Sequence, residues 1–200
     1  IINNEDIQFN IKALPYTLYN EFNKYKNNGN KIICPKHILY QISNYENVCF
    51  PITFKIKDTY LGVLEFVEFI DAIYIPNDLF YSLDLIENTE IELNLLHKNI
   101  EKGTMIKIKP QNDDFYFIED KKKYLEIHLK NLFNTITKNT IISIPYKDFT
   151  IPFLVTDCLP NDTISLVDID ELEVDIEPIN EPDMKIKTES ESESESESES

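Results

Sequence analysis

Apolar residues recur every second position in some parts of this chain and every third or fourth position in others. This alternation of periods predicts a series of short strands and helices. Residues 7–11 alternate between apolar and polar side chains, as in a half-buried strand. A second apolar run at residues 31–33 follows the turn-forming pair Asn28-Gly29 and ends at Pro35, so it predicts a turn followed by a short strand.

The segment after this strand predicts a helix that covers a sheet. Ile38, Ile42 and Tyr45 are spaced by three or four residues and would share one face of a helix of about three turns. Residues 52–56 then alternate again, and residues 59–66 predict another strand with a glycine inside it. Such a glycine indicates a bulge or the close approach of another backbone.

Two further helices have recognisable starts. Pro76 would begin a short helix that has Asn77 or Asp78 as its cap, and Asp120 would cap a longer helix. The buried stripe of the longer helix is predicted to consist of Leu125, Leu129, Leu132 and Phe133. Further strands are expected at residues 72–75, 91–95, 105–108, 140–146, 149–155 and 163–167.

These elements predict a β-rich α+β fold with three parts. Residues 1–109 form a β-rich unit with a closed or nearly closed sheet, and residues 110–178 form a small mixed α/β unit. The chain has 200 residues, of which 42% are hydrophobic, which is enough for a core. Residues 179–200 end in a strict Glu-Ser alternation that buries too little apolar surface to fold. We therefore expect a disordered acidic tail that acts as a solvated spacer.

Negative charge is concentrated toward the carboxy terminus. Residues 1–147 carry 19 acidic residues and 17 lysines, whereas residues 148–200 carry 17 acidic residues and 2 lysines. The net charge of −17 repels phosphate backbones and anionic lipid and favours basic protein partners. Nucleic acid is therefore not expected as a ligand. The chain also has no arginine, whose guanidinium group can bind phosphate through two parallel hydrogen bonds.

The candidate chemical groups do not form a catalytic or metal-binding motif. His37, His97 and His128 lie far apart with no metal-ligand spacing, and three glycines leave no phosphate-binding loop. We therefore expect no cofactor, no metal and no catalytic residue.

The cysteines and the apolar runs predict the state of the thiols and the absence of a membrane-spanning helix. Cys34, Cys49 and Cys158 are an odd set without a C-x-x-C spacing, which favours reduced core thiols over disulfides. No run reaches the ~18 uninterrupted apolar residues that a membrane-spanning helix needs.

An aspartic-type hydrolase is the one enzymatic alternative. Its paired carboxylates would come from Asp58-Thr59 and Asp162-Thr163, but neither pair is followed by the glycine that the catalytic loop of such enzymes requires. The simpler interpretation is that Asp58 and Asp162 are turn residues.

A set of short motifs occurs in a fixed order from about residue 10 to residue 178. They are Gly29-x-Lys31-Ile32-Ile33-x-Pro35, Phe50-Pro51-x-x-Phe54, Gly62-Val63-Leu64-Glu65-Phe66, Tyr74-Ile75-Pro76, Pro110-Gln111-x-x-Asp114-Phe115, Leu125-Glu126-x-x-Leu129-Lys130-Asn131 and Val174-Asp175-Ile176-x-Pro178. Together they resemble the amino-terminal domain of the ubiquitin fusion degradation protein 1 family. Asn28-Gly29-Asn30 departs from the double glycine of that family, and the segment from Leu129 to Ile144 carries an extra residue.

The resemblance implies a double-psi β-barrel followed by a smaller α/β part. It also implies a non-catalytic adaptor that binds ubiquitin or polyubiquitinated proteins and recruits them to a AAA unfoldase of the valosin-containing type, together with a nuclear-protein-localisation partner subunit. The process would be ubiquitin-dependent protein degradation, including ER-associated degradation. The ubiquitin-binding residues are not identified by sequence; an exposed apolar patch on the barrel is the place to look.

The resemblance also bears on the unfoldase contact and on the compartment. The contact with the unfoldase would use Phe-x-Gly-type segments outside this chain, which has no glycine after Gly103. The expected location is the cytoplasm, including the cytosolic face of the endoplasmic reticulum.

Two alternatives stay open at this point. The chain could be the amino-terminal adaptor-binding domain of an unfoldase, in which case a nucleotide-binding G-x-x-x-x-G-K-[ST] motif would be expected downstream instead of an acidic tail. It could also be an organellar protein-import version of the same adaptor, which would need an amino-terminal leader.

Overall fold

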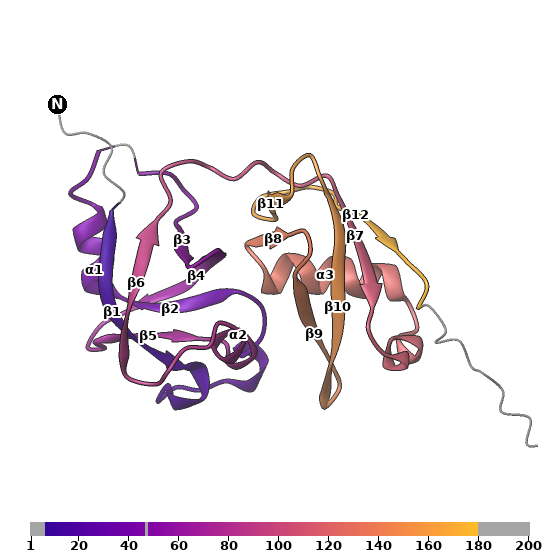
Figure 1. Ribbon diagram of the computed structural model, residues 1–200, viewed down its shortest axis with the longest axis horizontal. Coiled ribbons are helices and arrows are strands. Elements are labelled where there is room, and N and C mark those ends of the chain that lie inside the picture. The colour runs from indigo at the N-terminus through magenta and orange to yellow at the C-terminus, as the bar shows by residue number, and fades with distance from the viewer. Residues whose placement is uncertain (1–6, 47, 180–200) are drawn as a thin grey trace, which may run out of the picture.

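The chain forms two units that lie next to each other along its longest axis (Figure 1). The computed structural model describes residues 7–46 and 48–179. The predicted acidic tail lies outside these residues from position 180 onward.

The first unit is a closed barrel of six strands in the order β1-β5-β2-β4-β3-β6. Its strands are β1 (Gln8–Pro15), β2 (Lys31–Pro35), β3 (Thr53–Ile56), β4 (Thr59–Val67), β5 (Ala72–Ile75) and β6 (Thr89–Leu95). The pairs β1–β5 and β2–β4 are parallel, and the other pairs are antiparallel. Alternate side chains fill the barrel, with Phe54, Leu61 and Leu93 fully buried. The prediction of a β-rich α+β fold that begins with a barrel is confirmed.

Two short helices pack against the barrel core, α1 (Lys36–Ile42) and α2 (Asn77–Ser82). The predicted cap of α2 is wrong, because Pro76 occupies the cap position and Asn77 lies inside the helix. The Asn77 Oδ1 atom instead accepts a hydrogen bond from the Thr17 N–H at 3.1 Å, which ties α2 to the 3-10 turn η1 (Tyr16–Leu18). A second such turn, η2 (Lys24–Lys26), precedes β2.

The predicted length of the first helix is also wrong. It ends at Ile42, and Tyr45 follows it with half of its side chain exposed.

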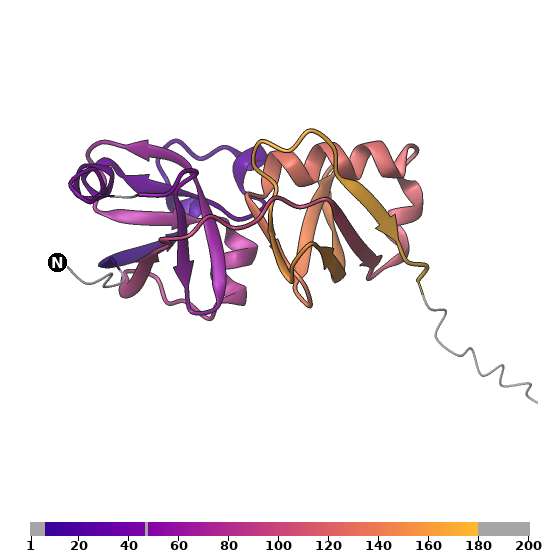
Figure 2. The same ribbon diagram turned by 90° about the horizontal axis from the view of Figure 1, so that it is seen from above.

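The second unit contains a four-stranded sheet in the order β12-β7-β10-β9 and a two-stranded sheet of β11 and β8. The strands are β7 (Met105–Pro110), β8 (Thr135–Thr137), β9 (Ile141–Tyr146), β10 (Phe149–Leu159), β11 (Thr163–Ser165) and β12 (Glu173–Ile176). The 3-10 turn η3 (Asp113–Phe117) follows β7, and the helix α3 (Lys121–Leu132) packs along the sheet (Figure 2).

The helix α3 follows its sequence pattern closely. The Asp120 side chain accepts a hydrogen bond from the Lys123 N–H, as predicted for a cap. Leu125, Leu129 and Phe133 are buried in the core of the second unit, and Leu132 is partly buried against it.

Two strands belong to the second unit in a way that the sequence pattern did not indicate. β7 pairs with β10 and β12, although the pattern groups residues 105–108 with the strands before them. β12 lies within the acidic stretch after Asp168, where Val174 is nevertheless buried. The barrel strands end at Leu95, so we propose that the two units divide within residues 96–104.

Candidate functional site

A buried asparagine joins the two units. Asn30 immediately precedes β2 and is only 8% exposed. Its Nδ2 group donates to the Thr135 carbonyl oxygen and to Thr135 Oγ1, both at 2.9 Å, and to the Tyr60 carbonyl oxygen at 3.2 Å. Its Oδ1 atom accepts from the Asn134 N–H at 2.9 Å. One side chain therefore holds β4 of the barrel against the segment that begins β8.

Two glycines allow the two units to approach closely at this junction. Gly29 has a φ of 84°, and a Cβ atom there would lie 2.0 Å from the Leu132 carbonyl oxygen. A Cβ atom on Gly62 would lie 2.0 Å from Asn134 Nδ2. The glycine inside β4 thus makes room for a side chain, whereas the sequence predicted a bulge or the close approach of another backbone.

A lysine extends the junction to the end of α3. The Lys31 ammonium group donates to the Asn131 carbonyl oxygen at 2.7 Å. Burial lowers the pKa of this lysine below its ordinary value.

A cleft of about 550 Å³ opens beside the junction. From the barrel it is lined by the β3–β4 turn and α2, and from the second unit by the end of α3, by β8 and by the start of β9. Its apolar lining residues are Leu79, Leu83, Phe133, Ile136, Ile141 and Ile142. Asp58 and Asp78 are the charged residues of this lining; Asp58 pairs with Lys55 at 3.3 Å, and the Lys57 ammonium group donates to the carbonyl oxygen of the lining residue Leu83. The cleft combines an apolar floor with anionic edges and can accept an apolar side chain next to a cation.

A second hollow lies on the outside of the barrel, between α1 and the β4–β5 turn. It has a volume of about 380 Å³ and contains Tyr40 and Phe69. Phe69 has a φ of 63° and a side chain that is 101% exposed, so its whole ring is presented to solvent. Lys36 pairs with Glu68 at 2.6 Å at the edge, and this contact holds the pKa of the lysine above its ordinary value. We call this hollow the Phe69 groove.

The two carboxylates of the hydrolase alternative lie in different units. Asp58 is in the β3–β4 turn, where it pairs with Lys55 at 3.3 Å, and it borders the cleft. Asp162 is in the turn between β10 and β11, and its carbonyl oxygen accepts from the Lys138 N–H at 2.7 Å. Asp162 does not line the cleft that Asp58 borders. Both are turn residues, and the structure does not bring them into one pocket.

The histidines are used locally. His97 Nε2 accepts from the Ile7 N–H at 3.2 Å, and His128 Nδ1 lies 2.8 Å from the Tyr124 carbonyl oxygen. His37 borders the Phe69 groove. Within the residues that the structure describes, no group of three or more His, Cys, Asp or Glu side chains could hold a metal ion. In the same part of the chain, no helix is long and apolar enough to cross a membrane.

Each unit has a buried thiol in its core. Cys34 lies on β2 in the barrel, and Cys158 lies on β10 in the second unit. Burial raises the pKa of both, that of Cys158 to about 11. Cys49 is partly buried, and its thiol donates to the His97 carbonyl oxygen at 3.0 Å.

Sequence reasoning did not identify Asn30 or Phe69. The local sequence around Asn30 gives little sign that this side chain is buried, because its partners Asn134 and Thr135 lie about 100 positions away. Phe69 follows the last residue of β4 by two positions, and nothing in the local pattern separates it from the aromatic residues of the core.

Two models of one protein family match consecutive parts of the chain. The model described as "Ubiquitin fusion degradation protein UFD1, N-terminal subdomain 1" matches residues 7–99, and the model of N-terminal subdomain 2 of the same protein matches residues 102–179. The first match covers the barrel, and the second covers the four-stranded sheet with α3.

Curated relatives agree with these matches. "Ubiquitin fusion degradation protein 1" of Schizosaccharomyces pombe is 34% identical over 161 residues, which are 76% of this chain and 46% of that protein. The homologue of Dictyostelium discoideum is 30% identical over 84% of this chain and 51% of that protein. "Ubiquitin recognition factor in ER-associated degradation protein 1" of Homo sapiens is 30% identical over 80% of this chain and 53% of that protein. The chain therefore spans about half the length of the curated relatives that it matches.

Proposed function

Because the chain belongs to the family of ubiquitin fusion degradation protein 1, we propose that it is a non-catalytic adaptor that binds ubiquitin or ubiquitin chains on client proteins. It presents these clients to a AAA unfoldase of the valosin-containing type, together with a nuclear-protein-localisation partner subunit. The observation that supports this proposal best is that both amino-terminal subdomain models match, in order and without overlap, over 7–99 and 102–179.

The proposed setting is ubiquitin-dependent degradation on the cytosolic side of the endoplasmic reticulum. The human relative is named a ubiquitin recognition factor in ER-associated degradation, which supports this setting. The contact with the unfoldase is proposed to lie outside this chain.

We propose the Phe69 groove as the surface that contacts ubiquitin. The recognition face of ubiquitin combines an apolar patch with basic residues, and the groove offers the exposed rings of Phe69 and Tyr40 next to the Glu68 carboxylate, which pairs with Lys36. An exposed aromatic ring buries a large apolar area on binding and breaks few hydrogen bonds to water. Anchor residues in interfaces usually have this character.

Titration of the isotope-labelled chain with single ubiquitin, and with chains of the linkage that marks proteins for degradation, tests the function. We expect amide resonances to shift in both titrations. If no resonance shifts at about 1 mM ubiquitin, where even a dissociation constant in the millimolar range would be detected, the proposed function is wrong.

Variants of the groove test the surface separately. Phe69→Ala should weaken binding by about tenfold or more, as expected for an aromatic anchor. Ile86→Ala removes another exposed apolar side chain of the same unit and should leave the affinity unchanged. If ubiquitin binds but Phe69→Ala has no effect, the function stands and the proposed surface is wrong.

A further inference from the structure

The edge strand β9 lies next to the cleft between the two units. In the four-stranded sheet, β9 pairs with β10 on one side only. Thr140, Ile141, Ile142 and Ser143 line the cleft on the other side. The barrel faces this edge through α2 (Figure 1). An open strand edge therefore borders the cleft, and Ile141 on this edge is 65% exposed.

The register of β9 fixes which backbone groups point into the cleft. The Thr140 carbonyl oxygen accepts from the Val155 N–H, and Ile142 pairs with Phe153. Because hydrogen bonding alternates along an antiparallel pair, the N–H and C=O groups of Ile141 and Ser143 point away from β10. The described part of the chain supplies no hydrogen-bond partner for these four groups.

The outer edge is limited in length. Pro145 has no N–H group, and its carbonyl oxygen accepts a hydrogen bond from the Tyr124 hydroxyl. The usable edge is therefore the short stretch Ile141–Ser143 alone. It can exchange up to four backbone hydrogen bonds with an added strand.

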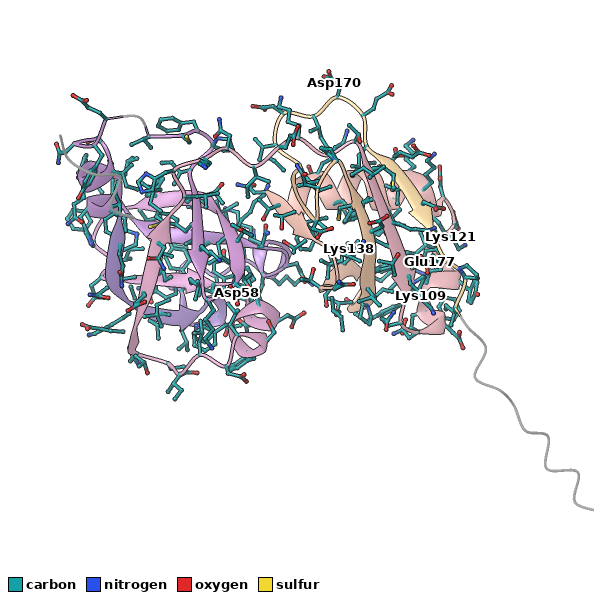
Figure 3. The ribbon with its side chains drawn as sticks, turned by 45° about the horizontal axis from the view of Figure 1, so that its top comes forward. Asp58, Lys109, Lys121, Lys138, Asp170 and Glu177 are labelled. Atoms are coloured by element: carbon teal, nitrogen blue, oxygen red, sulfur yellow. The ribbon has the colours of Figure 1, made fainter. Side chains whose placement is uncertain are left out.

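The charges around this edge favour one kind of occupant. Asp58 lies on the side of the barrel that faces the second unit (Figure 3), and Asp78 lies in the first turn of α2. These two carboxylates are the charged groups of the cleft lining. Asp58 pairs with Lys55 through a side chain that is itself fully exposed, so an incoming cation can reach it. The carboxylates oppose a strand edge flanked by the apolar side chains of Leu79, Leu83 and Ile141. An incoming segment gains from a lysine or arginine flanked by aliphatic residues.

We propose that the cleft is a docking site for an extended, basic and aliphatic peptide segment of a partner protein, which pairs with Ile141 and Ser143 as an additional strand next to β9. The segment places a cation near Asp58 and Asp78 and an aliphatic side chain among the apolar residues of the cleft. This site lies apart from the Phe69 groove and does not depend on ubiquitin binding.

A short synthetic peptide tests the site on the full chain. The probe is acetyl-Ile-Lys-Val-Lys-Ile-amide, titrated into isotope-labelled protein to about 2 mM, which detects dissociation constants in the millimolar range. We expect the amide resonances of Ile141 and Ser143 to shift, and their hydrogen exchange to slow. The same peptide with glutamate in place of lysine should bind at least about tenfold more weakly, because it places like charges beside Asp58 and Asp78.

Two changes separate backbone pairing from side-chain contact. Ile141→Pro removes an N–H group that no strand of the sheet uses, so the sheet is retained, whereas the peptide should bind about tenfold or more weakly. Ile141→Ala keeps the N–H group and should change the affinity by less than about threefold. If the proline variant does not fold, the probe with N-methyl groups at alternate residues makes the same test on the unchanged protein.

Three results would overturn the proposal. The first is that the amide resonances of Ile141 and Ser143 do not shift. The second is that neither Ile141→Pro nor N-methylation of the peptide changes the affinity. The third is that sedimentation shows a dimer that Ile141→Pro abolishes. The last result would assign the β9 edge to a second copy of the chain. Loss of ubiquitin binding after Phe69→Ala, with the peptide titration unchanged, is expected and would show that the two surfaces are separate.

Discussion

Asn30 shows how one side chain can decide the relation between two folding units. Both of its polar atoms are used, and its partners come from β4 and from the start of β8. A buried amide that satisfies its donors and its acceptor adds about 0.5–1.5 kcal/mol per hydrogen bond, but each partner left without it costs about 1–3 kcal/mol. Its importance therefore lies mainly in what its removal would leave unpaired.

Replacing Asn30 with alanine should lower the free energy of unfolding by about 2–3 kcal/mol, because it leaves the Asn134 N–H without its acceptor and removes one of the two hydrogen bonds of the Thr135 hydroxyl. Urea unfolding followed by circular dichroism measures this loss. Asn10→Ala is the matched control on an exposed position of β1 and should change the value by less than about 0.5 kcal/mol. A loss below about 1 kcal/mol for Asn30→Ala would show that water replaces the amide, and would contradict its assigned role.

At the scale of elements, the sequence predicted those helices and strands whose apolar residues recur at a regular spacing. Alternation located most strands, and Asp120 with its apolar stripe located α3, because these signals lie within one element. β8 and β12 were missed although other strands of three or four residues were located: two of the three residues of β8 are threonines, and two of the four residues of β12 are acidic. β7 was grouped with the wrong sheet because its partner β10 lies more than 40 positions away.

The candidate surfaces were less predictable than the strands. The cleft exists only because α2 and β9, which are separated by about 60 positions, face each other across the junction. The charge of Asp58 was visible in the sequence, but not its position at the edge of a cavity. The sequence could name an exposed apolar patch on the barrel only as the place to look, and Phe69 could be identified only from its exposure.

The strands β2 and β10 each carry a thiol inside the core of one unit, so the cysteines report on the two units separately. At pH 8, iodoacetamide should modify Cys49 at least about tenfold faster than Cys34 or Cys158, because a buried thiol reacts only after local opening. Mass spectrometry of peptides sampled over time gives the three rates. Equal rates for all three cysteines would contradict the packing of both cores.

The pH dependence of this labelling has a definite sign. Burial raises the pKa of Cys158 to about 11. Above about pH 8.5, the Cys158 thiol therefore deprotonates in the unfolded state but stays protonated in the folded state. The stability that this thiol contributes is complete below about pH 8.5 and is lost as the pH rises toward 11. Labelling of Cys158 should therefore rise more steeply between pH 9 and pH 11 in the native protein than in 8 M urea.

At the scale of the whole molecule, about a third of the net charge lies outside both cores. Both cores lie within residues 7–179, whereas residues 180–200 contain eight acidic residues and two lysines and contribute −6 of the net charge of −17. The described chain ends beside β7, where the Glu177 N–H donates to the Ile108 carbonyl oxygen, next to Lys109. Figure 3 shows Lys121 at this same end of the second unit, away from the barrel that carries the Phe69 groove.

Removal of residues 180–200 therefore separates long-range attraction from contact. If ubiquitin binds through the Phe69 groove, the truncated chain should keep its dissociation constant within about twofold at 0.5 M salt, where charges more than about 5 Å apart are screened. At 20 mM salt, its association rate should fall by about two- to tenfold, because fewer acidic groups attract the basic face of ubiquitin. Stopped-flow fluorescence at both salt concentrations measures these quantities. An equal loss of affinity at low and high salt would mean that the acidic segment touches ubiquitin directly, and the groove would then be only part of the binding surface.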